Sequence, residues 1–348
     1  MMGKRLRYID FEKGICALIV VYIHITHIYM RNTELNFLHR LCIPQFALLA
    51  GYNLCHKENV NTIKTILFTL SKMIYIYFIS IIVTQLIFQK NIDLESAIII
   101  VITGGVVPFY NIPIWYVPHY MSLFIISLLV IKMNNIISQI VEKNFNKKNY
   151  ISYEFLLIIS ILLAYIGFVY NGENYFYIKQ SLIMVPFTMI GFVINKSEST
   201  LKKYLEGIDK NRKRFIYLLS IIIIIVLLVL FIFLTLSDGN VDIWPFFFDS
   251  KLKFYITSIS GGILLFVVSK ILCGISILDI FTKFIGYIGK KSIYICCLSQ
   301  PVQIVIINHY NDFFKKLNEE RFSIFLLKII IIVIVTIIFS YLFEREQK

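Results

Sequence analysis

Charged side chains are scarce in this chain of 348 residues. Asp, Glu, Lys and Arg make up 16% of it and hydrophobic residues 58%, whereas soluble domains usually carry roughly 25% charged residues. Residues 221–233 form a run without a single polar side chain. Together with a mean hydropathy of +0.77, this pattern excludes a water-soluble globule, because so much apolar surface requires lipid as its solvent.

The cysteines show neither a disulfide framework nor a zinc-site pattern. Six are present, none forms a CxxC pair, and all lie in or beside apolar segments. This predicts buried, inert thiols and no metal site. The net charge of +13 raises the possibility of a nucleic-acid partner, but the basic residues are spread over loops and form no basic face of a soluble module. We therefore expect no nucleic-acid binding.

Apolar stretches of spanning length recur along the whole chain. They predict an all-α, polytopic membrane protein with about ten transmembrane helices. The expected spans are residues 14–30, 37–54, 65–88, 114–131, 154–170, 178–194, 215–236, 254–272, 292–309 and 323–343. A weaker apolar piece at 95–107 is broken by Gly104 and Gly105, which predicts a re-entrant or interfacial segment.

The positions of Lys and Arg predict the orientation. With the amino terminus inside, the inner segments carry 22 of these residues and the outer loops 8. This bias predicts two cytoplasmic termini in a cell membrane, with membrane lipid as the surrounding partner. The longest polar loop, residues 195–214, is too short to fold alone, so we expect residues 1–348 to form a single integral-membrane domain.

The first expected helix carries the densest set of intramembrane polar residues. At 100° per residue, Lys13 and His24 lie about 20° apart around the helix axis, and Asp10 and His27 fall in the same wedge. A neutral imidazole in a dry site can act as a general base, and a cation at the inner end can hold a phosphate-bearing donor. This stripe therefore suits acyl or proton transfer. The alternative is that the histidines only hydrogen-bond neighbouring helices.

A family resemblance appears in this first helix. Residues 7–17 (RYIDFEKGICA), leading through 18–23 to His24, resemble the opening of membrane acyltransferase family 3. In that family an Asp, a basic residue and a histidine eleven positions later mark the first helix. The basic residue is usually arginine and here it is Lys13, which keeps the charge but loses bidentate phosphate binding.

Three further stretches carry the same resemblance over the whole chain. Residues 43–52 (IPQFALLAGY) resemble the second-helix pattern, with Ala50 in place of serine. Residues 113–118 (PIWYVP) resemble the entry to the fourth expected helix, and 288–294 (IGKKSIY) the segment before the ninth. Many members then carry a histidine where this chain has Ser299.

The resemblance implies an O-acyltransferase. It implies transfer of an acyl group, most often acetyl, from cytoplasmic acyl-CoA to a hydroxyl of a surface polysaccharide or glycolipid. The family is one of bacterial membranes. His24 would be the general base, with Asp10 and His27 as orienting residues. Asp10 would orient or neutralise Lys13, or it would be an interfacial charge without a catalytic part. Lys13 and Lys72 would hold the CoA phosphates, although Lys72 could instead extend to the membrane interface. Acyl-CoA is a donor substrate here, and we expect no bound cofactor.

Trp115, Tyr116 and His119 are the candidates for binding the acceptor. Trp115 and Tyr116 stand at the outer end of an expected span, where aromatic residues also gather as an interfacial belt. His119 lies one turn further into the membrane. The acceptor would be a glycan or glycolipid that approaches from the outer face.

Two other functions fit a chain of this kind. One is a transporter or exporter of a polysaccharide or small molecule, since intramembrane charges also serve transport. Such proteins often contain paired repeats, and Gly104-Gly105 has no counterpart in the second half of the chain. The other is a non-catalytic partner in surface-polymer assembly, which Ala50 and Ser299 leave open.

Overall fold

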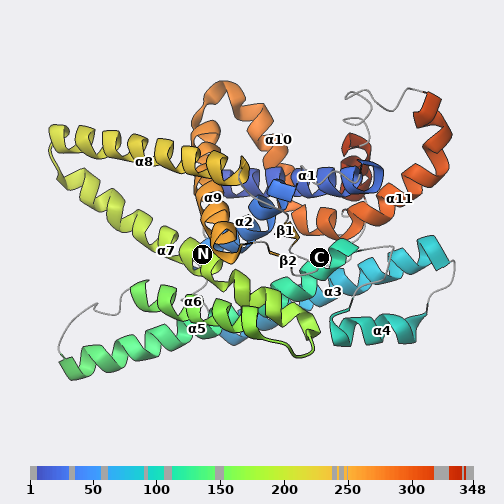
Figure 1. Ribbon diagram of the computed structural model, residues 1–348, viewed down its shortest axis with the longest axis horizontal. Coiled ribbons are helices and arrows are strands. Elements are labelled where there is room, and N and C mark those ends of the chain that lie inside the picture. Colours follow the sequence, from blue (N-terminus) through green and yellow to red (C-terminus); the bar gives the residue numbers. More distant parts are fainter. Residues whose placement is uncertain are drawn as a thin grey trace.

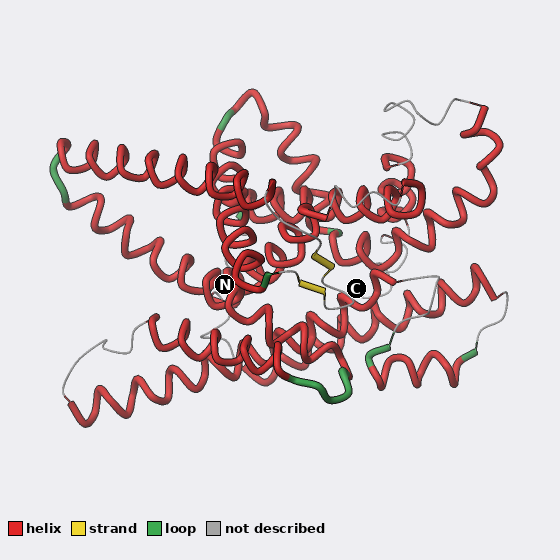
Figure 2. Tube along the Cα trace, viewed as in Figure 1, coloured by secondary structure: helices red, strands yellow, loops and turns green. Residues whose placement is uncertain are grey.

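The fold is almost entirely helical in the part of the chain that the structure describes (Figures 1 and 2). The structure is a computed structural model. It describes residues 6–30, 36–55, 62–89, 93–105, 112–145, 153–236, 241–242, 247–248, 250–316, 329–338 and 341. Within these ranges the only strands are the antiparallel pair β1 (Val241–Asp242) and β2 (Phe247–Phe248). The expected all-α class is therefore confirmed for these residues.

In the described ranges, eleven labelled α-helices follow one another. Their bounds are α1 (Arg7–Met30), α2 (Asn36–Leu54), α3 (Thr62–Gln89), α4 (Leu94–Thr103), α5 (Tyr116–Phe145), α6 (Tyr153–Val169), α7 (Ile178–Gly207), α8 (Lys210–Leu236), α9 (Lys251–Gly274), α10 (Asp279–Lys290) and α11 (Ser292–Lys316). Three short 3-10 helices are η3 (Ile112–Trp115), η4 (Tyr175–Tyr177) and η5 (Ser276–Leu278). Residues 329–338 add a short apolar helical segment.

Among the described residues, five helices are long and apolar enough to cross a membrane. They comprise residues 66–88, 113–140, 175–207, 214–235 and 251–274. None of the apolar stretch in α8 is buried inside the protein. Its isoleucine-rich surface therefore faces outward, as expected of a helix surrounded by lipid. These helices make the chain a membrane protein by length and composition.

The count of ten spans stays a prediction. Four more expected spans coincide with shorter apolar helices, at residues 41–54, 153–169, 292–305 and 329–338. The first expected span lies in α1, whose opening turns carry charged residues. The weak piece at 95–107 forms the ten-residue helix α4, which ends where Gly104 adopts a left-handed conformation. Both chain termini lie outside the described residues, so their cytoplasmic placement is also still a prediction.

Glycines allow two pairs of helices to approach closely. α1 packs along α10 and α2 packs along α7, as Figure 1 shows for α1 and α10. A Cβ atom added to Gly289 of α10 would overlap the backbone oxygen of Asp10, and one added to Gly51 of α2 would overlap that of Thr188. Small residues at such positions bring membrane helices into backbone contact. The first helix is therefore held tightly against α10.

The buried core around α1 is shared by several elements. One cluster joins Phe11, Cys16 and Val21 of α1 to Cys42 and Phe46 of α2, and it also contains residues of α10, α11 and segment 329–338. These elements come from the two ends of the sequence. The fold thus brings α1, α2 and α11 together around the space described next.

Candidate functional site

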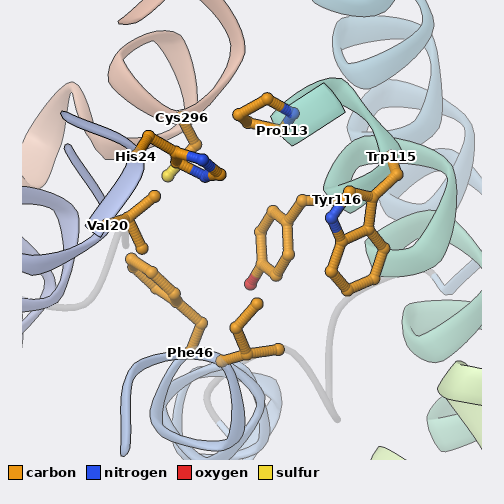
Figure 3. A pocket seen from close by; sticks show the side chains of 8 residues that line it. Val20, His24, Phe46, Pro113, Trp115, Tyr116 and Cys296 are labelled. Atoms are coloured by element: carbon orange, nitrogen blue, oxygen red, sulfur yellow. The ribbon is translucent and has the colours of Figure 1, made fainter. Parts of the chain in front are cut away.

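A small cavity of about 30 Å³ lies where α1, α2, η3, α5 and α11 meet (Figure 3). Its walls are mostly apolar or aromatic. The lining residues are Val20 and His24 of α1, Ile43 and Phe46 of α2, Pro113 and Trp115 of η3, Tyr116 of α5, and Cys296 of α11. A water molecule needs roughly 10–15 Å³ of cavity volume. The cavity therefore has room for a group of about the size of two or three water molecules. It is a site for a reacting group and not for a whole sugar.

His24 is the titratable base in the cavity wall. It lies in the last third of the 24-residue helix α1 and is half-buried. Figure 3 shows its imidazole at the same edge of the cavity as Cys296. The predicted general base therefore lines the cavity.

Trp115 and Tyr116 are brought to the cavity by the junction of η3 and α5. Pro113, in the first turn, suits the start of a helical segment because it lacks the N–H that would have no partner there. Trp115 is buried, with 4% of its surface exposed. The Tyr116 ring lies 5.5 Å from that of Phe46 across the cavity wall. The structure thus brings together three predicted site residues, His24, Trp115 and Tyr116.

His119 lies behind this wall and does not line the cavity. Its ring centroid is 5.3 Å from that of Trp115 and 5.8 Å from that of Tyr116. Its Nδ1 is 3.0 Å from the Ser181 hydroxyl, which also donates to the Tyr177 carbonyl oxygen at 2.9 Å. Among the described residues, Nε2 has no hydrogen-bond partner. The structure therefore makes His119 a support for the two lining aromatics.

A strained turn holds a third aromatic residue against Trp115. Phe176 and Tyr177 both have positive φ angles, 51° and 52°, which non-glycine residues rarely adopt. The Ser122 hydroxyl donates to the Phe176 carbonyl oxygen at 3.0 Å, and the Tyr177 ring lies 5.4 Å from that of Trp115. Such strain persists only where surrounding contacts fix the backbone. Here it fixes the aromatic wall of the cavity.

The charged residues at the start of α1 lie away from the cavity. Lys13 is half-buried, and eleven residues of helix place it about 16 Å from His24 along the axis. Asp10 is buried, with 4% exposed, where α1 meets α10. Lys72 is exposed on α3, and the side chain of His27 lies outside what the structure describes.

A second charged cluster surrounds the same end of α1. The Tyr52 hydroxyl donates to Glu198 at 2.6 Å and lies 2.6 Å from the Tyr8 hydroxyl. Lys270 forms an ion pair with Glu198 and lies 5.4 Å from the Tyr8 ring centroid. This cluster places the Lys270 ammonium group beside the first turn of α1.

Residues 6–345 match the acyltransferase domain of a known family. The chain belongs to acyltransferase family 3. No curated protein and no solved structure matches it. Membership of this family supports acyltransferase activity in a membrane protein. It also confirms the family resemblance of the first helix.

Sequence reasoning missed two relationships around α1. Glu12 is the most deeply buried acidic side chain of this helix, with 0% exposed, and the Gln45 amide donates a hydrogen bond to its carboxyl group. Cys296 is buried, as the sequence predicts for its thiol, and it also lines the cavity. Both relationships join separate helices. Spacing along one helix therefore gives no signal for either.

The polar groups of the cavity come from three different side-chain types. Within the described ranges no group of three or more His, Cys, Asp or Glu residues is placed to hold a metal ion. The cavity instead offers a base, a thiol and a phenol in a largely apolar setting. Such a site can move a proton while an acyl group changes partner, because it keeps bulk water away from the reacting carbonyl.

Proposed function

We propose that this acyltransferase moves an acyl group, most simply acetyl, from cytoplasmic acyl-CoA to a hydroxyl of a cell-surface polysaccharide or glycolipid. The observation that carries the proposal is the cavity that gathers His24, Trp115 and Tyr116 from three separate elements. The size of the cavity supports a short acyl chain. Its mixture of one base and several aromatic walls supports transfer to an uncharged acceptor.

His24 acts as the general base in this proposal. It takes the proton of the acceptor hydroxyl while the oxygen attacks the carbonyl of an acyl thioester, and it returns the proton to the departing thiolate. The sulfur leaves as the new ester bond forms, so no cofactor is needed. The Tyr116 hydroxyl is the candidate donor for the carbonyl oxygen as negative charge develops on it.

The donor approaches from the inner end of α1. Lys13 holds a CoA phosphate, and the long pantetheine arm spans the distance of about 16 Å from Lys13 to the cavity. Asp10 and His27 orient the groups on α1. Lys72, which is exposed, contributes a weaker long-range attraction, because solvent and salt screen it.

The acceptor approaches from the opposite end, along the aromatic wall. The buried Trp115 ring gives the cavity an apolar wall, and His119 and Tyr177 hold that ring in place. Only the reacting hydroxyl needs to enter the cavity. This arrangement explains how a small cavity serves a large acceptor.

The experiment that tests the function uses the purified protein in lipid nanodiscs with radiolabelled acetyl-CoA. We expect release of free CoA and transfer of label to a glycan fraction from the native cell envelope. Mass analysis of surface glycans from cells with and without the gene identifies the added group. Unchanged glycans together with no CoA release would refute the proposed function.

A further inference from the structure

We propose that Cys296 is a catalytic nucleophile that carries the acyl group as a thioester between the donor and the acceptor. This inference deepens the proposed function and rests on it. It concerns which thioester the acceptor hydroxyl attacks: that of acyl-CoA itself, or one formed on the protein. The geometry of the cavity favours the second.

The first observation is that the cavity contains a nucleophile and a base together. Cys296 enters from α11 and His24 from α1, and both line the same small space. A thiol becomes an effective nucleophile when a neighbouring imidazole takes its proton. Cys297, the next residue along α11, is fully buried in a different cluster with Tyr77 and Met121 and does not line the cavity.

The second observation is the size of the cavity. At about 30 Å³, it accommodates a group of the size of an acetyl, while the rest of the donor and of the acceptor stays outside it. Two large substrates that must reach one carbonyl are handled more simply in turn. A thioester on Cys296 keeps the acyl group in the cavity while the donor leaves and the acceptor enters.

A buried hydroxyl lies one turn further along the same face of α11. Ser299 is 0% exposed, and among the described residues its Oγ has no hydrogen-bond partner. Hydroxyls inside helices commonly donate to the backbone carbonyl of the preceding turn, as Ser260 and Thr336 do here. The Ser299 hydroxyl makes no such bond, so its proton is available to another acceptor. Residues three apart on a helix are neighbours, which places Ser299 next to Cys296. It is suited to donate to the carbonyl oxygen of an acyl group on Cys296.

The chemistry balances in two steps. First, His24 takes the Cys296 thiol proton, the sulfur bonds to the acyl carbon of acyl-CoA, and the carbon–sulfur bond to CoA breaks. The CoA thiolate takes the proton from His24 and leaves as free CoA. Second, His24 takes the acceptor hydroxyl proton, and the oxygen bonds to the acyl carbon. The carbon–sulfur bond to Cys296 then breaks, and the thiolate regains its proton from His24.

The test is to trap the acyl-enzyme in the absence of acceptor. Purified full-length protein in nanodiscs is incubated with radiolabelled acetyl-CoA, denatured at low pH and counted, with neutral hydroxylamine used to release thioesters. We expect close to one label per chain, released by hydroxylamine, and a gain of one acetyl mass on the peptide that contains Cys296. Cys296→Ala should reduce the label to background and acyl transfer by at least about a hundredfold.

Matched variants separate the possible outcomes. Cys297→Ala is the control for a neighbouring buried thiol and should label as the wild type does. Ser299→Ala should slow labelling without changing its site. An unlabelled wild-type protein that still transfers acetyl to glycan would overturn the thioester intermediate and leave the proposed function intact. No consumption of acetyl-CoA by the wild type would overturn both. The peptide mass of the wild type decides the matter even if Cys296→Ala fails to fold.

Discussion

The side-chain amide of Gln45 donates a hydrogen bond to the Glu12 carboxylate across the contact between α1 and α2. Both residues are buried, with 1% and 0% of their surfaces exposed. Phe46, which follows Gln45, lines the cavity, and His24 lies three turns beyond Glu12 on the same helix. This buried hydrogen bond therefore fixes the relative position of two helices that build the cavity wall.

Replacing Glu12 distinguishes the hydrogen bond from the charge. Glu12→Gln keeps an acceptor for the Gln45 amide and should leave the melting temperature unchanged or higher, because no charge is then buried. Glu12→Ala leaves that amide without a partner and should cost about 1–3 kcal/mol of stability. Thermal unfolding in detergent by intrinsic fluorescence measures both. Equal losses in the two variants would show that the carboxylate charge is what matters.

The close approach of α1 and α10 predicts a strong effect at Gly289. A Cβ at this position overlaps the backbone oxygen of Asp10, so Gly289→Ala must push the helices apart and should cost about 1–3 kcal/mol. Gly274, at the end of α9, is the matched control, because a Cβ there meets nothing within 4 Å. The melting temperatures of the two variants measure the difference. Similar values for both would contradict the packing described for α1 and α10.

An ion pair at the start of α10 predicts a pH dependence. Lys283, 2.6 Å from Asp279, and Arg7 on α1 together hold the pKa of the Asp279 carboxyl below its usual value. A lowered folded-state pKa contributes stability above the unfolded value of about 3.9, and that stability is lost as the pH falls through the folded value.

The Asp279→Asn variant tests this dependence. Its melting temperature should fall less than that of the wild type between pH 5 and pH 3, values chosen to bracket a carboxyl titration near about 3.9. The difference should be small and should shrink in high salt, because the carboxylate is exposed and the pair is screened. Asp209→Asn, at an exposed turn before α8, serves as the control. Parallel curves for Asp279→Asn and the wild type would exclude the ion pair as a source of stability.

Lys13 tests where the donor binds. Lys13→Arg keeps the positive charge and should preserve donor affinity, whereas Lys13→Ala should weaken it by about 10- to 100-fold, the loss of one charge-assisted contact. Lys72→Ala should have the smaller effect, because Lys72 is exposed on α3. The KM for acyl-CoA at saturating acceptor gives the comparison. The same KM in all three variants would remove Lys13 from the donor site.

Sequence patterns predict the helices and part of the site, for distinct physical reasons. Apolar runs such as that in α8 indicate membrane helices directly, because every backbone polar group must be paired in lipid. His24 stands out because an ionisable residue in such a run is costly. Trp115 and Tyr116 were assigned through the family resemblance, and the structure places them beside His24.

What the patterns miss depends on contacts between distant helices. The hydrogen bond from Gln45 to Glu12 joins α2 to α1, and the position of Cys296 in the cavity requires α11 to pack on α1. His119 lies one turn after Tyr116 on α5, yet only Tyr116 lines the cavity. The His119 ring instead lies within hydrogen-bond distance of Ser181 on α7. The exposure of Lys72 likewise depends on which face of α3 its neighbours cover.

The most direct test of the account is the acyl-transfer rate of His24→Ala, measured in nanodiscs with radiolabelled acetyl-CoA and a native glycan acceptor. The account predicts a loss of about 10²–10⁴-fold, the usual contribution of a general base, with unchanged membrane insertion and partial recovery when imidazole is added. Wild-type turnover by His24→Ala would contradict it.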